Sequence, residues 1–202
     1  RCIQCGKTAV KTEADFRKIY EDVKRNMETF FSIRINAGIR VEMVNSRKLH
    51  KALKKTFVPT NNADGRIIGV AIKDRNGYRL MIENGAPRMA SMLTIAHELT
   101  HIWQYLNWND KEIAKKYGDY KLQIYEGMAK WVEVQYAYLI NESAMARREE
   151  IVTALRQDQY GEGFVRYRAN YPLSRGTTIK GRTPFMDTET PLDMDFCGEL
   201  VV

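Results

Sequence analysis

Two histidines stand four residues apart in the stretch His97-Glu98-Leu99-Thr100-His101, and they are two of the three histidines in the chain. Positions i and i+4 lie on one face of an α-helix, so both imidazoles can reach one metal ion if this stretch is helical. Glu98 projects about 100° around the helix from His97 and can contact a water molecule on that metal. The stretch therefore requires a helix and predicts a zinc site with a general base beside it.

A third ligand is expected, because a catalytic zinc ion usually takes three protein ligands and leaves one position for water. The buried helix predicted over residues 119–140 carries two carboxylates on a stripe of otherwise apolar or small residues, and such carboxylates are costly unless paired or bound to metal. We expect Glu126 to be the ligand, with Gly127 allowing close approach of a neighbouring helix. Glu133 is the next candidate ligand, or it holds an imidazole N–H. Lys130 is the alternative partner of either acid.

The remaining elements are predicted from hydrophobic spacing and turn signals. Helices are expected over residues 12–33, 46–56, 87–107, 110–117, 119–140, 143–157 and 161–170, and strands over residues 39–44, 66–73 and 78–83. Asn76-Gly77 indicates a hairpin between the last two strands, because both residues tolerate a positive φ. Strands precede most helices, so the class is α+β. A small mixed or antiparallel sheet should pack on the helix with the histidines, and the C-terminal part should be mainly helical.

The surroundings of the two histidines carry a family resemblance. The neighbouring residues are uncharged: Thr94, Ile95 and Ala96 precede the first histidine, and Ile102 and Trp103 follow the second. With a later buried glutamate, residues 94–133 resemble the gluzincins, which are zinc metallopeptidases. The resemblance implies a zincin-like fold that hydrolyses peptide bonds, with a catalytic Zn²⁺ held by His97, His101 and Glu126 and with Glu98 as general base.

The same resemblance implies a place for the substrate. In zincins the strand before the motif helix lies at the sheet edge and pairs with an extended substrate by β-augmentation. Here that strand comprises Arg79, Leu80, Met81, Ile82 and Glu83, which otherwise form only the second arm of the hairpin. A further donor normally helps to stabilise the oxyanion. The candidates, each of which can equally be a packing or surface residue, are Tyr160, Tyr167, Arg168 and Tyr171.

A narrower resemblance begins at the first residues. The run Arg1-Cys2-Ile3-Gln4-Cys5-Gly6-Lys7 is similar to the middle of a LIM domain, where a Cys-x-x-Cys-Gly-Lys run opens the second zinc module. The order of a long helix, a strand, a hairpin, the histidine motif and a later Glu-Gly resembles the peptidase domain that follows LIM modules in the ubiquitin-activated growth-regulating peptidases of plants and their bacterial relatives. No second Cys-x-x-Cys follows within about 20 residues, so a complete LIM zinc site is absent from this sequence.

The expected organisation has three parts, namely a partial zinc-knuckle segment over residues 1–10, a zincin-like peptidase domain over residues 11–173 and a loop-rich tail over residues 174–202. Cys2, Cys5 and Cys197 can hold a second, structural zinc if His50 or Asp195 joins them. A Cys2–Cys5 disulfide and free thiols are the alternatives.

The chain of 202 residues has a formal net charge of +7, which favours acidic partners. The basic residues are spread out, which indicates solubility more than nucleic-acid binding. No apolar run approaches the about 18 residues of a membrane span, and the start does not resemble a signal peptide, so an intracellular location is slightly favoured. The expected partner is a protein or peptide substrate. Two alternatives are a non-catalytic zincin-fold module, against which Glu98 argues, and a protease tethered to DNA or another partner.

Overall fold

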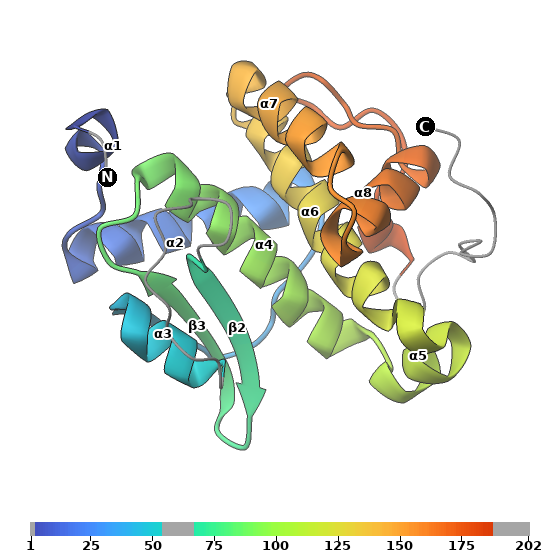
Figure 1. Ribbon diagram of the computed structural model, residues 1–202, viewed down its shortest axis with the longest axis horizontal. Helices are drawn as coiled ribbons and strands as arrows, with labels where there is room; N and C mark the ends of the chain where they lie inside the picture. Colours follow the sequence, from blue (N-terminus) through green and yellow to red (C-terminus); the bar gives the residue numbers. More distant parts are fainter. Residues whose placement is uncertain (1–2, 54–66, 188–202) are drawn as a thin grey trace. The chain divides into compact units, whose positions relative to one another are not determined.

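The computed structural model describes residues 3–53 and 67–187 and has the predicted α+β composition (Figure 1). The chain divides into two compact units, Arg1–Ile102 and Trp103–Val202. Helix α4 (Arg88–Asn107) crosses the division, so its part up to Ile102 belongs to the first unit and its end to the second. The expected three-part organisation stays a prediction.

The first unit contains the sheet. Its elements are α1 (Ile3–Lys7), α2 (Glu13–Phe30), β1 (Ile39–Val44), α3 (Ser46–Ala52), β2 (Gly69–Asp74), β3 (Gly77–Glu83) and the beginning of α4. The predicted start of α2 is confirmed, because the Thr12 hydroxyl accepts a hydrogen bond from the Asp15 amide at 3.1 Å and donates one to the Asp15 carboxylate at 2.6 Å. The helix ends at Phe30, three residues before the predicted end. Ser32, just beyond it, has a φ of 53°, which does not continue a right-handed helix.

The sheet has the order β1–β3–β2, with β1 parallel and β2 antiparallel to β3. The strand expected at the edge, Arg79–Glu83, lies within β3 and is paired on both sides. The prediction that this strand receives the substrate is therefore wrong. The physical reason is that β1, which comes much earlier in the chain, pairs in parallel with β3 and occupies the side that the substrate would need.

The hairpin between β2 and β3 is confirmed, with Asp74 opposite Gly77 and a turn at Arg75-Asn76. Only the glycine uses the left-handed region, with a φ of 107°; the described non-glycine residues with positive φ are Ser32 and Asn141. The Asp74 carboxylate accepts a hydrogen bond from the Asn76 amide at 2.8 Å. An aspartate-stabilised turn followed by glycine thus replaces the expected turn with two positive φ values.

The two faces of the sheet are covered by different helices. Leu49 of α3 packs on one face against Val44, Val70 and Met81. On the other face, Gly69 brings β2 close to α4, because a Cβ atom at Gly69 would lie 2.5 Å from the Thr94 side chain. The start of β2 is therefore fixed against the turn of α4 that precedes His97.

The second unit is helical. It contains the end of α4, α5 (Asp110–Tyr117), the 3₁₀ turn η2 (Gly118–Tyr120), α6 (Lys121–Leu139), α7 (Ser143–Ala154), α8 (Gln159–Asn170) and the 3₁₀ turn η3 (Pro184–Met186). Helix α6 is buried over most of its length, as expected, and packs against α7 and α8 (Figure 1). No helix in the described ranges combines the length and apolarity that crossing a membrane would require.

The segment after α8 is irregular but is anchored to the second unit at two places. Gln135 of α6 exchanges two hydrogen bonds with the Ser174 main chain, at 2.8 and 2.7 Å. Further along, the ring of Phe185 meets Trp103 edge to face, with centroids 4.9 Å apart. The segment is therefore anchored to the core of the second unit at Ser174 and Phe185, whereas most of the residues between them are exposed.

Candidate metal centre

Helix α4 presents both motif histidines on one side. The helix begins directly after Pro87, whose fixed φ suits a helix start, and runs without interruption through the motif. The Nε2 atoms of His97 and His101 lie 3.1 Å apart, and each residue is 8% exposed. Two donors about 2.1 Å from a tetrahedral ion stand about 3.4 Å apart, so the imidazoles have nearly the spacing that a zinc ion needs.

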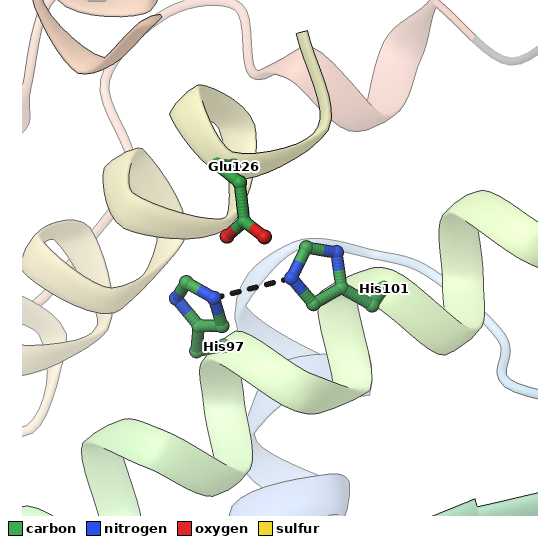
Figure 2. A group of neighbouring side chains, drawn as sticks. All are labelled: His97, His101 and Glu126. Carbon is green, nitrogen blue, oxygen red and sulfur yellow. Dashed lines mark hydrogen bonds between the residues drawn. The ribbon is translucent and has the colours of Figure 1, made fainter. Parts of the chain in front are cut away.

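The carboxylate of Glu126 completes the group. The ligand atoms of His97, His101 and Glu126 all lie within 4.8 Å of one another, and the glutamate is half-buried. Figure 2 shows the carboxylate facing the two rings. Among the residues that the structure describes, no other set of three or more His, Cys, Asp or Glu side chains has this proximity. The group can hold a metal ion, and Glu126 lies where a third ligand would have to be.

Two contacts, one on each side of Glu126 in the sequence, fix the position of this part of α6. The side chain of Gln104, which is fully buried near the end of α4, donates a hydrogen bond to the Tyr125 carbonyl at 3.0 Å. On the other side, a Cβ atom at Gly127 would lie 2.4 Å from the carbonyl carbon of Gly163, so α6 and α8 touch backbone to backbone. The expected close approach at Gly127 is confirmed.

Gln104 is a residue that sequence reasoning missed. It lies three positions after His101, and the same continuous helix therefore carries two candidate ligands and the anchor for the segment with the third candidate. A signal was present, because an uncharged amide in an otherwise apolar helix end must find hydrogen-bond partners when buried. The sequence did not indicate that this partner would be the main chain beside Glu126.

Comparison with known families matches residues 4–181 to the Family of unknown function (DUF6055). The chain belongs to this family. Comparisons with curated proteins and with solved structures give no match. The conclusions about function therefore depend on the chemistry of the site in this DUF6055 member.

Glu98 follows His97 in α4 and is 7% exposed. The rest of the motif faces the interior: Leu99 and Thr100 are fully buried, and the Thr100 hydroxyl donates to the Ala96 carbonyl at 2.8 Å. These residues hold the helix against the core, and His97, Glu98 and His101 remain its candidate site residues.

The carboxylate of Glu133 pairs with Lys130, whose Nζ donates to Glu133 Oε2 at 2.8 Å. This was the alternative partner named from the sequence. Burial, and then the negative charge of Glu133, raise the pKa of the nearby Glu149. The role of Glu133 as acceptor of an imidazole N–H stays a prediction.

Two of the oxyanion candidates lie deep in the second unit. Tyr167 is 1% exposed and stacks on Tyr171, with ring centroids 6.0 Å apart. Burial raises the pKa of Tyr167 well above the ordinary value, and its hydroxyl has no hydrogen-bond partner among the described residues. The Tyr171 hydroxyl donates to Asp187. Both side chains belong to the core rather than to a surface that a peptide can reach.

The other two candidates are nearer to solvent. Arg168 lies 3.5 Å from the buried carboxylate of Glu150 and forms an ion pair with it. Tyr160 is half-buried at the start of α8, and the Arg156 guanidinium lies 4.7 Å from its ring centroid. Tyr160 is therefore the tyrosine candidate that burial leaves accessible.

The cysteines add no described contact. Cys2, Cys197 and Asp195 lie outside the described residues, and only the backbone of Cys5 is described, in α1. His50, the other suggested ligand, has its Nδ1 2.9 Å from the Ser46 carbonyl within α3. The structural zinc stays a prediction.

Proposed function

We propose that this chain is a zinc-dependent peptidase of gluzincin type, with His97, His101 and Glu126 as zinc ligands and Glu98 as general base. The observation that supports it most is the convergence of two imidazoles and one carboxylate within 4.8 Å. Two nitrogen donors and one oxygen donor are a common ligand set of catalytic zinc, and three ligands leave a position for water. A purely structural site usually has four protein ligands and no need of an adjacent base.

Zinc bound in this group would acidify a water molecule and polarise the carbonyl group of the scissile peptide. The chain's own contribution is to position the proton carrier. Glu98 would accept the proton of the attacking water and return it to the nitrogen of the leaving amine, so no net proton is consumed in that exchange. Tyr160 is the candidate for donating a hydrogen bond to the oxyanion, since Tyr167 and Tyr171 are buried in the core.

In this proposal the substrate pairs with β2 instead of β3. The Glu83 amide donates to the Ile68 carbonyl at 2.7 Å, and alternate residues of an antiparallel strand face the partner. Gly69, Ala71 and Lys73 therefore direct their amides and carbonyls away from β3. No strand pairs with this side of β2 in the described part of the chain. An extended peptide added here would lie next to the turn of α4 that precedes His97.

The deciding experiment combines metal analysis with a peptide-library cleavage assay on the purified chain. One zinc ion per site and cleavage that stops on adding a chelator and returns with zinc would support the proposal. Zinc with no cleavage in any library would favour the non-catalytic module instead. A variant of an exposed glutamate on α5, Glu112→Gln, is the matched control for loss of a carboxylate.

A further inference from the structure

Lys130 has two carboxylates of its own helix within reach. It lies four positions after Glu126 and three positions before Glu133 on α6. On an isolated helix, a glutamate four residues before a lysine is the favourable order for an ion pair. The local sequence therefore favours a pair between Lys130 and the metal-ligand candidate Glu126.

The structure has the other pair. The Lys130 ammonium lies 2.8 Å from Glu133 Oε2, with side-chain exposures of 17% and 12%. Glu149 of α7 lies near this pair, because the charge of Glu133 raises its pKa and the charge of Lys130 lowers it. The charge of Glu133 also raises the pKa of Arg156. Because the pair is largely shielded from solvent, salt screens it less than a surface pair.

This choice of partner matters for the metal group. An ammonium ion on Glu126 would use the carboxylate lone pairs and the negative charge that a zinc ion needs from its third ligand. We propose that Glu133 is a positioning residue that holds Lys130 away from Glu126 and so keeps the third ligand available for the metal. The inference rests on the zinc-binding part of the proposed function and does not require peptidase activity.

The proposal differs in a measurable way from the expectation that Glu133 supports an imidazole N–H. In both cases, removing the Glu133 charge weakens zinc binding. Only when Lys130 is the competitor does removal of the ammonium restore the affinity. Methionine keeps most of the length and the apolar stem of lysine, so Lys130→Met removes the charge with little loss of packing.

The test is a competition titration of zinc against a chromophoric chelator, with the full chain and four variants. We expect Glu133→Gln to lower zinc affinity about tenfold, as supporting residues of zinc ligands commonly do. We expect Glu133→Gln/Lys130→Met to return within about twofold of the unsubstituted chain. Glu150→Gln removes the buried carboxylate of another ion pair of the second unit and should leave the affinity unchanged. Glu133→Asp, which keeps the charge, serves if the glutamine variant does not fold, with a smaller loss and the same rescue.

Three results bear on the inference. Rescue by Lys130→Met supports it. Unchanged affinity in Glu133→Gln, or a loss that Lys130→Met does not restore, overturns it and leaves the zinc site of the proposed function intact. If the unsubstituted chain binds no zinc, the proposed function fails first and this inference fails with it, so the two failures are distinguished by the first titration.

Discussion

His97 and His101 direct their Nε2 atoms at each other across 3.1 Å. A neutral imidazole nitrogen is either a donor or an acceptor, so two acceptors at this distance would repel unless a proton or a cation lies between them. One continuous helix fixes this spacing, which suits either a shared proton or a metal ion between the two rings. Loss of the third ligand should therefore leave the two rings in place.

Glu126→Ala should weaken zinc binding by more than about 100-fold, since removal of a direct ligand costs more than loss of a supporting residue. Competition with a chelator measures the affinity, and circular dichroism checks that α6 is retained. Glu112→Ala is the matched control. An unchanged zinc affinity would show that Glu126 is not a ligand.

Glu98→Gln should retain zinc and lower kcat/KM on a cleaved peptide by about 10² to 10⁴, the usual contribution of a general base. Glutamine has nearly the same shape, so folding should be unaffected. Zinc content and cleavage are measured on the same preparation. Full activity in this variant would contradict the assignment of Glu98, whatever the metal content.

Ala71→Pro should lower kcat/KM about fivefold to tenfold through a higher KM, because it removes an amide that faces the open side of β2 and would bind the substrate main chain. Ile72→Pro is the control, because the Ile72 amide faces β3. Removing that amide should destabilise the sheet itself. Zinc affinity should be unchanged in Ala71→Pro. An unaltered KM would remove β2 from the substrate site.

Gly163→Ala should destabilise the second unit by about 1–3 kcal/mol, because its Cβ would lie 2.3 Å from the Gln123 carbonyl oxygen. The affected atoms belong to the backbone of α6, which cannot rotate away. Gly38→Ala is the matched control, with no atom within 4 Å of the added Cβ. Chemical denaturation compares the free energies of unfolding, and equal values for the two variants would contradict the backbone contact.

The stability of the second unit should fall in acid through Glu150. Burial pulls the pKa of Glu150 upward, but hydrogen bonds from Arg175 and Tyr138 outweigh it and leave the pKa below its ordinary value. A lowered folded-state pKa stabilises the protein above the unfolded pKa of about 4.3, and that stabilisation is lost as the pH falls towards the folded value. Between pH 3 and pH 7, the free energy of unfolding should depend less on pH in Glu150→Gln than in the unsubstituted chain. Identical pH profiles would exclude this contribution.

The elements of this chain were predictable where their signals are local. The helix with the histidines, the first strand and the helix over residues 110–117 have the expected limits or differ by one residue, since caps and spacing specify them. The predicted start of α8, residue 161, lies two residues after the observed start at Gln159. Asp158 caps it by accepting from the amides of Tyr160 and Gly161, a signal readable in the sequence.

Long-range pairing was not predictable in the same way. The central position of β3 depends on the parallel pairing of β1, whose strand is more than 30 residues earlier. Similarly, Tyr160 and Tyr167 have the same side-chain chemistry, and tertiary packing alone makes one half-buried and the other inaccessible. The proximity of Glu126 to the two histidines was predictable, because an acid on a buried stripe needs a partner. Its anchor, Gln104, required knowledge of which helices meet.

The contact between Gly127 and Gly163 has a mechanical consequence. Where two helices meet through side chains, small rotamer changes allow them to slide, but two glycines leave only main-chain atoms at the contact. Translation of α6 relative to α8 at this point is therefore stiff, and the residue beside the contact shares that stiffness. Because Glu126 is next to this contact, a displacement of α8 should displace the backbone of Glu126 with it.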